Sequence, residues 1–475
     1  MTSTERDRSG TEWEPAVDRP SPVDLLVEQN RTREPDLVPV RHGRMLVSPF
    51  TFYRGSAKIM ATDLANTQTA GLQVQLCGDA HLSNFGGFGS PERQLVFDLN
   101  DFDETLPGPF EYDLKRLATS FTIAARNNGF TPKDSRAITR ESVKAYRQAM
   151  TEFASMRTLD VWYAHMSDRE FEAALLAARE DLGSGGAPNG KRKGGKKSKA
   201  AKAAREEIDR TIAATTKAIR KARKRDSSQA LARLTEVVDG EYRIVSQPLV
   251  MLPLRDVTEA WGLSADETLH LVENQFRAYK ASLSADRRHL LEKYTVVDVA
   301  RKVVGVGSVG TRAFIVLLQG RDIGDPLFLQ VKEATRSVLE DHLPKTHFHT
   351  PGQRVVEGQR LMQAAPDILL GWTKGVQDDR FYYWRQLRDM KVSAEVETMT
   401  PLRMTIYARM CGWTLAHAHA RSGDPLAISE YLGADENVDR SIAAFAERYA
   451  DQNLRDYETF AQAVADGRIE ATTGV

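Results

Sequence analysis

The chain has few cysteines, no excess of either charge and no long apolar run. Of its 475 residues only Cys77 and Cys411 are cysteines, which excludes a disulfide framework and a zinc site built from cysteines. Lys plus Arg and Asp plus Glu number 65 each, so net charge gives no reason to expect a nucleic acid or a membrane as partner. No apolar stretch approaches the length of about 18 residues that a membrane span needs. The N-terminus lacks the apolar centre of a secretion signal, so we expect a cytoplasmic protein.

Several common catalytic signatures are also missing. The sequence contains no G-x-x-x-x-G-K-[ST], no H-E-x-x-H and no G-x-S-x-G, which are typical of P-loop NTPases, zinc peptidases and serine hydrolases, respectively. His417 and His419 lie two positions apart in a predicted helix and therefore on different faces. We expect these histidines to pack or cap rather than to bind zinc.

Two neighbouring polar segments carry the strongest chemical signal. Residues 77–84 (Cys-Gly-Asp-Ala-His-Leu-Ser-Asn) follow an apolar strand, and an acidic strand end comes next at residues 98–104. Phosphoryl transfer from a nucleotide needs a carboxylate that orients a hydroxyl, with an amide and a carboxylate on Mg²⁺. The pattern predicts that Asp79 orients or deprotonates the hydroxyl and that Asn84 and Asp101 hold Mg²⁺. Alternatively, the acidic residues form a solvated turn.

A glycine-rich segment lies far downstream, at residues 305–310 (Gly-Val-Gly-Ser-Val-Gly). It matches both a dinucleotide fingerprint and a kinase phosphate loop. A dinucleotide site needs a helix at the motif, whereas here an apolar strand, a turn and a second strand follow. This order favours the covering hairpin of a kinase small lobe over a hairpin with structural glycines. The residues expected at the ATP phosphates are Gly305, Gly307, Ser308 and Gly310.

The second of these strands carries Lys332 near its end. A kinase-type lysine points inward, onto the ATP phosphates, and needs a helix carboxylate to hold it. Glu357, in a predicted helix over residues 352–364, is the expected partner, and Glu340 is a weaker candidate. We expect both members of the Lys332–Glu357 pair to face Asp101 across a gap the size of a triphosphate.

Composition divides the chain into five parts, of which the first and third are not expected to contribute to the core. A Gly- and Lys-rich stretch indicates a flexible linker, followed by an exposed basic helix. The alternative is a nucleic-acid contact through residues 191–225, which is less favoured because no aromatic residues interleave there. The expected parts are a disordered segment (1–38), the catalytic-loop part of a helical lobe (39–182), the basic linker and helix (183–229), an ATP-binding small lobe (230–392) and the C-terminal part of the helical lobe (393–475).

Residues 77–84 resemble the His-Gly-Asp-x-His-x-x-Asn catalytic loop of aminoglycoside and choline phosphotransferases, with Cys77 in place of the first His. Residues 100–104 and 112–114 are similar to the segments that follow that loop, which implies that Asp101 is the metal ligand, with Asp98 as its rival. From about Pro39 onward the chain also resembles a bacterial family known as domain of unknown function 2252. The segments that carry this second resemblance lie at residues 52–55, 113–117, 358–360, 385–391 and 419–424.

The resemblance implies an α+β, protein-kinase-like fold with two lobes, in circularly permuted order. The helix that precedes the catalytic loop in phosphotransferases corresponds here to residues 415–424, near the C-terminus, so we expect that helix to end beside Leu76. The implied function is transfer of phosphate from ATP·Mg²⁺ to a hydroxyl of a small molecule or, less favoured, a protein. The alternatives are AMP transfer on the same fold, and a non-catalytic ATP-binding or interaction module.

Overall fold

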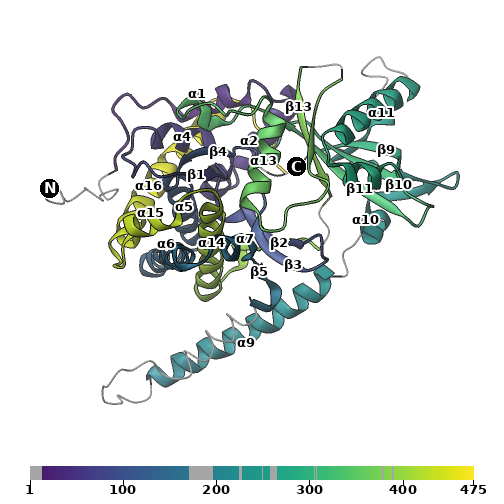
Figure 1. Ribbon diagram of the computed structural model, residues 1–475. Helices are drawn as coiled ribbons and strands as arrows, with labels where there is room; N and C mark the ends of the chain where they lie inside the picture. The colour runs from purple at the N-terminus through teal and green to yellow at the C-terminus, as the bar shows by residue number, and fades with distance from the viewer. Residues whose placement is uncertain are drawn as a thin grey trace.

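The computed structural model describes residues 13–170, 196–223, 227–248, 250–256, 265–303, 305, 307–376, 379–387 and 390–474. The chain is a mixed α+β protein, and each described pair of strands is antiparallel, as expected. A sheet with its covering helices lies beside a larger, mostly helical part (Figure 1). The expected linker lies mostly outside the described residues.

Six strands form the sheet lobe, in the order β12-β13-β11-β10-β9-β8. The strand, turn, strand, turn, strand order predicted around the glycine-rich segment is confirmed, and its last strand carries Lys332. Helices α11 (Ala265–Ala281) and α12 (Ala285–Leu291) cover one face, and α10 (Ser227–Leu234) packs on the other. The strands of the sheet are β8 (Met251–Pro253), β9 (Thr295–Lys302), β10 (Ala313–Gln319), β11 (Pro326–Ala334), β12 (Gly371–Lys374) and β13 (Phe381–Gln386).

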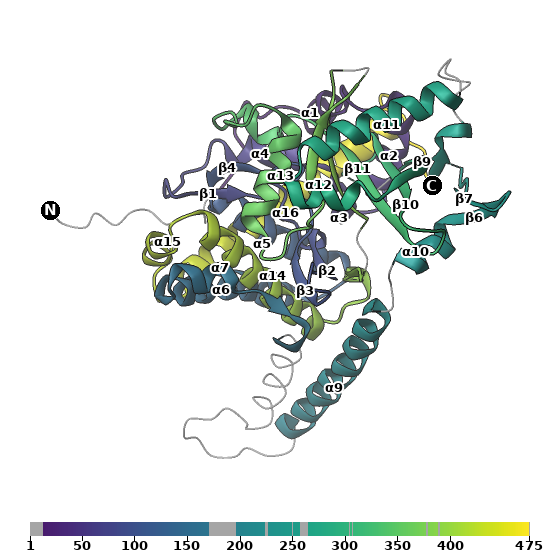
Figure 2. The same cartoon turned by 45° about the vertical axis from the view of Figure 1, so that its right-hand side comes forward.

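The helical lobe joins the first and last thirds of the chain in one apolar core. These two stretches of the chain are far apart in sequence, but their helices lie side by side (Figures 1 and 2). The helices are α2 (Val38–Met45), α3 (Pro49–Gly55), α4 (Ala57–Leu64), α5 (Glu111–Asn127), α6 (Pro132–Ser155), α7 (Thr158–Tyr163), α14 (Pro401–Ser422), α15 (Pro425–Leu432) and α16 (Asn437–Ala465). Two small antiparallel units complete it, β1 (Gln73–Leu76) with β4 (Leu106–Pro109), and β2 (Phe85–Gly89) with β3 (Leu95–Leu99), β5 (Met166–Ser167) and β14 (Val392–Ser393).

The N-terminal segment differs from its prediction. Residues 1–12 lie outside the described part, but residues 13–38 are ordered around α1 (Pro22–Asn30) and a short 3-10 helix, η2 (Pro35–Leu37). Leu26 joins an apolar cluster with residues of α3 and α16. Arg19 lies 2.6 Å from Asp63 and from Asp456, in largely buried ion pairs. These partners are distant in sequence, so local composition could not indicate that the segment packs.

Helix α9 (Lys196–Arg223) is the predicted basic helix, and it projects from the body of the molecule in both views (Figures 1 and 2). Its last turns are not exposed on all sides. Ile219 and Ala222 are buried against Leu95 and Met390 at the edge of the β2–β3 sheet. The solvated helix expected from composition therefore describes only part of α9.

Helices α14 and α6 cross closely at Gly412, where a Cβ atom would lie 2.2 Å from the Ser142 carbonyl oxygen. Ala is favoured over Gly in a helix by about 1 kcal/mol, but forcing an atom into a packed contact costs about 1–3 kcal/mol. We expect Gly412→Ala to lower the urea midpoint of unfolding. The matched control is Gly324→Ala in an exposed turn, where the nearest atom is a movable Asp322 side-chain oxygen. A higher midpoint for Gly412→Ala would contradict this account of the crossing.

Candidate functional site

The loop between β1 and a 3-10 helix, η3 (Leu82–Asn84), is held by a carboxylate of α5. Asp113 accepts hydrogen bonds from the backbone N–H groups of Cys77 at 2.7 Å and Gly78 at 3.0 Å. Gly78 has a φ of 85°, and a Cβ there would lie 2.3 Å from the Glu104 carbonyl oxygen. Glycine is therefore required both by the left-handed backbone and by the close approach of the acidic segment.

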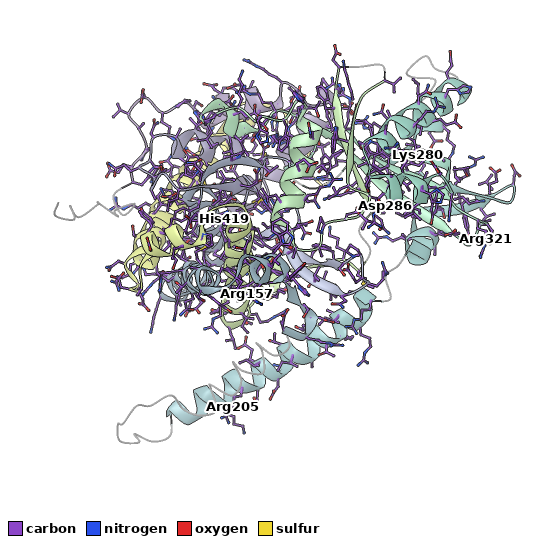
Figure 3. The ribbon with its side chains drawn as sticks, in the orientation of Figure 1. Arg157, Arg205, Lys280, Asp286, Arg321 and His419 are labelled. Carbon is purple, nitrogen blue, oxygen red and sulfur yellow. The ribbon has the colours of Figure 1, made fainter. Side chains whose placement is uncertain are left out.

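The C-terminal helix α14 fixes this loop from behind. His419 lies within the helical lobe (Figure 3), with Nε2 3.3 Å from Asp113 Oδ2 and Nδ1 2.8 Å from the Tyr146 hydroxyl. The Ser422 hydroxyl accepts from the backbone N–H of Gln75 at 3.1 Å, so the end of α14 abuts β1. The prediction that this helix ends beside the strand of the catalytic loop is confirmed.

Asp79 lies at the centre of the loop beside Arg116, Asn84 and His81, whose Nε2 is 3.8 Å from Asp79 Oδ2. Arg116 donates from Nε to Asp79 Oδ1 at 2.8 Å, and Asn84 donates from Nδ2 to the Asp79 carbonyl oxygen at 2.9 Å. Burial raises the pKa of Asp79 to about 6, although the charge of Arg116 and its hydrogen bond act to lower that pKa. Asp79 therefore titrates near neutral pH while keeping an oriented carboxylate.

The acidic segment after β3 meets the sheet lobe at Lys332. This lysine is 5% exposed, and its Nζ lies 3.3 Å from Asp103 Oδ2 and 4.0 Å from Asp101 Oδ2. The Tyr383 hydroxyl donates to Asp103 Oδ1 at 2.6 Å. Burial and the charge of Asp103 raise the pKa of Asp101. Although burial acts the other way, Lys332 and Tyr383 lower the pKa of Asp103.

The inward direction predicted for Lys332 is thus confirmed, but its predicted partner is wrong. Glu357 lies 2.8 Å from Arg360, one turn along α13 (Pro351–Met362). The residue of α13 that reaches the acidic segment is Arg354, which donates to the Asp103 carbonyl oxygen at 2.7 Å. The predicted triphosphate-sized gap is also wrong, because Lys332 contacts the acidic segment directly.

Asp98, the rival metal ligand, lies on β3 and faces a different direction. Its carboxylate accepts hydrogen bonds from the backbone N–H groups of Leu99 at 2.8 Å and Ala364 at 3.2 Å. Asp101, beyond the end of the strand, instead lines a cleft that Asp79 and Asn84 also line. Asp101, and not Asp98, therefore lies with Asp79 and Asn84 at this cleft.

The glycine-rich loop lies at the same cleft and is attached to the N-terminal segment. Gly305 and Gly310 have φ angles of 69° and 87°, which side chains rarely adopt. A Cβ at Gly310 would lie 3.0 Å from the Arg33 side chain, and the Gly310 carbonyl oxygen accepts from the backbone N–H of Glu34 at 2.8 Å. Gly305, Gly307 and Ser308 line the cleft, whereas Gly310 does not.

We call this space the acidic cleft. Segments more than 200 positions apart in sequence line it together, as predicted for Asp79, Asn84, Asp101, Gly305, Gly307 and Ser308. The lining residues are Gln29, Arg33, Arg54, Gly55, Ala57, Cys77, Asp79, His81, Asn84, Asp101, Asp103, Glu104, Gly305, Gly307, Ser308, Thr311, Glu333 and Thr335.

Several titratable residues that line the acidic cleft were not predicted as site residues, among them Arg33, Arg54, His81 and Glu104. Burial raises the pKa of Glu104 to about 7, although a hydrogen bond from the backbone N–H of Val338 opposes this. Burial lowers the pKa of Arg33 to about 10 and that of His81 well below its ordinary value. Arg54 belongs to residues 52–55, a segment already marked by the family resemblance, so a signal for it existed.

Among the described residues, no three His, Cys, Asp or Glu side chains are arranged to hold a metal ion. In the described part of the chain there is likewise no helix with the length and apolar character to cross a bilayer.

Residues 33–185 and 190–463 match the profile of a family described as uncharacterized protein conserved in bacteria (DUF2252). The chain therefore belongs to this bacterial family, as its sequence segments indicated. No curated protein and no solved structure gives a significant match to the chain.

We expect Arg116→Gln to raise the pKa of Asp79 above 6, because the substitution removes the opposite charge but leaves the carboxyl buried. Carboxyl carbon NMR against pH would measure the pKa, with Asp79→Asn to assign the signal. Arg157→Gln is the control, since Arg157 is 87% exposed and pairs with its neighbour Asp160 in the helical lobe (Figure 3). An unchanged or lower Asp79 pKa in Arg116→Gln would refute this assignment.

Proposed function

We propose that the chain is an ATP-dependent phosphotransferase that acts on a hydroxyl of a small molecule, with a protein-kinase-like fold in permuted order. The observation that carries the proposal is the acidic cleft, where the loop of Asp79 and Asn84, the acidic segment and the glycine-rich hairpin converge. These are the parts that position the acceptor, the metal and the nucleotide phosphates in kinases. The contact between α14 and β1 supports the permuted order, because it joins the ends that an unpermuted chain would connect.

In the transfer, the acceptor oxygen forms a bond to the γ-phosphorus of ATP while the bond from that phosphorus to the bridging oxygen breaks. ADP leaves with the electron pair, and Asp79 takes the hydroxyl proton. Arg116 orients one Asp79 oxygen, and burial brings the pKa of Asp79 close to neutral, where a base is both ionised and able to accept a proton.

The donor set of the acidic cleft fits Mg²⁺, which prefers oxygen ligands. Asn84 uses its amide nitrogen to bind the Asp79 carbonyl, so its side-chain oxygen remains as a ligand. Asp101 supplies a partly exposed carboxylate, and Lys332 favours the ionised form of that carboxylate. When bound, Mg²⁺ would neutralise charge on the phosphates. Two protein ligands suffice because phosphates and water complete the shell of this ion.

Labelled ATP tests the proposal directly. The purified chain is incubated with Mg²⁺, a cell metabolite extract and ATP labelled at either the γ- or the α-phosphate. Phosphoryl transfer predicts a product labelled only from γ-labelled ATP, with the mass increment of a phosphate. A product labelled from α-labelled ATP would assign AMP transfer instead. No labelled product, together with no binding of ATP, would refute the proposal.

We expect Asp79→Asn to lower the transfer rate about 10²- to 10⁴-fold, the usual contribution of a general base. ATP binding should be retained, because Asp79 is assigned to the acceptor and not to the nucleotide. Asp322→Asn is the control, since this carboxylate is exposed in the turn between β10 and β11. A transfer rate for Asp79→Asn within a few fold of the parent chain would refute the role of Asp79.

The transfer rate should also fall as the pH is lowered. Asp79 must be ionised to accept the proton, and its pKa is raised to about 6, so the rate should fall about tenfold per pH unit below pH 6. Glu104, with a pKa raised to about 7, is the other candidate for such a transition. The residual activity of Asp79→Asn should lose the transition, whereas Glu104→Gln should keep it. The reverse result would assign the transition to Glu104.

A further inference from the structure

Arg54 is placed in the acidic cleft by a rigid helix end. Helix α3 begins with a capping box between Ser48 and Thr51, and three buried aromatic residues hold it in the core. Arg54 follows Phe50 by one helical turn, and its guanidinium lies 5.9 Å from the centroid of that ring. Both the helix and the ring contact direct Arg54 into the space that Asp79 and His81 line.

The guanidinium of Arg54 has no hydrogen bond or ion pair with any side chain or backbone group in the described ranges, and its Nε is fully buried without a partner. The neighbouring Arg116 differs, because it is hydrogen-bonded to both Asp79 and the Tyr53 carbonyl oxygen. Arg54 is half-buried, and a guanidinium whose donors have no protein partner is suited to bind an anion. Burial lowers the pKa of Arg54, with the charges of Glu397 and Asp79 opposing.

The two arginines of the acidic cleft that the proposed transfer does not use have different hydrogen-bond partners and charged neighbours. Arg33 donates to the Val309 carbonyl oxygen of the glycine-rich loop and responds to the charges of Glu104 and Asp103. Arg54 responds to Asp79 but to neither of those two carboxylates. Arg33 thus lies with the elements assigned to the nucleotide. The Arg54 backbone is next to Gly307, where a Cβ would lie 3.2 Å from the Arg54 carbonyl oxygen, but its guanidinium charge acts on Asp79, the proposed base.

We infer that the acceptor is an anion: a hydroxyl compound bearing a phosphate or carboxylate group that Arg54 binds while its hydroxyl lies at Asp79. This inference rests on the proposed function for the identity of the reaction, but the anion site itself can be measured without any transfer. The planar fork of a guanidinium matches two oxygens of either group. His81, whose Nδ1 is buried without a hydrogen-bond partner, lines the same side of the cleft.

Calorimetric titration of the full chain with inorganic phosphate, and separately with acetate, tests the anion site. Both titrations are run with saturating, non-hydrolysable ATP analogue and Mg²⁺, so that the nucleotide phosphates occupy their own positions. We expect at least one of the two anions to bind once per chain, and Arg54→Gln to weaken that binding at least tenfold. The anion affinity of Arg54→Lys should lie between that of the parent chain and that of Arg54→Gln, because lysine keeps the charge but lacks the planar fork of the guanidinium.

The control variant is Arg321→Gln, since Arg321 is 85% exposed at the far turn of the sheet lobe (Figure 3) and should leave anion binding unchanged. Arg54→Gln should not lower the thermal midpoint, because no protein hydrogen bond is lost. A lower midpoint, or anion binding that Arg54→Gln leaves unchanged, would overturn the inference. Displacement of the anion by the ATP analogue would overturn it too, because Arg54 would then belong to the nucleotide site.

An activity measurement separates this inference from the proposed function. The metabolite extract is divided by anion exchange, and each fraction is tested with γ-labelled ATP. Label in the retained, anionic fraction that Arg54→Gln abolishes would support both proposals. Label only in the unretained fraction would overturn the anionic acceptor and leave the phosphotransferase intact. Anion binding that depends on Arg54, without transfer and without binding of the ATP analogue, would overturn the phosphotransferase and leave the anion site.

Discussion

The partly buried carboxylates of the acidic segment need cations, and this need joins the two lobes. From the sheet, Lys332 forms an ion pair with the Asp103 carboxylate and the Tyr383 hydroxyl donates a hydrogen bond to it. Arg354 of α13 donates to the Asp103 carbonyl oxygen. Removing a carboxylate from water costs several kcal/mol unless charges and hydrogen bonds replace the solvent. The sheet, α13 and the segment after β3 are therefore fixed relative to one another. Asp101 lies 4.0 Å from the same lysine and lines the acidic cleft at the edge of this network.

A second network explains why the loop after β1 does not depend on the order of its supporting segments along the chain. Asp113 holds the backbone of Cys77 and Gly78, and His419 binds Asp113 from the C-terminal helix. The Tyr146 hydroxyl lies 2.8 Å from the other ring nitrogen of His419, which fixes the ring from α6. Each of these contacts depends on side chains that meet in space, and none requires α14 to precede β1 in sequence. A permuted chain can therefore build the same loop.

Much of the fold could be predicted from local patterns. The hairpin around the glycine-rich segment, the helix with Glu357 and the C-terminal helices follow from apolar periodicity and turn residues, and all occur near the predicted bounds. Glycines at Gly78, Gly305 and Gly310 also marked real backbone requirements, because each has a positive φ. Motif spacing placed Asp79, Asn84 and Asp101 at one cleft, since Asp79 and Asp101 follow strand ends and Asn84 closes the short loop that begins with Asp79.

The wrong or missing site predictions concern residues whose partners are set by contacts in the folded chain. Analogy predicted Glu357 beside Lys332, but the phase of α13 directs Arg354 to the acidic segment, and Lys332 binds Asp101 and Asp103. Helical periodicity gives the face of a helix, not which neighbour that face will meet. Arg33 was missed for a similar reason, because its segment has the composition of a loose terminus and acquires its partners only in the folded chain.

That N-terminal segment also determines where the glycine-rich loop lies. Glu34 forms ion pairs with Arg301 of β9 and with Arg312, at 2.9 and 3.2 Å, and its backbone binds the loop at Gly310. Arg44 of α2 donates to the Gly305 carbonyl oxygen at 2.6 Å. The loop is thus held at both ends by residues that also pack on the helical lobe. A hairpin with no other support would be free to move with its sheet, whereas here the position of the loop over Asp79 is tied to the lobe that carries Asp79.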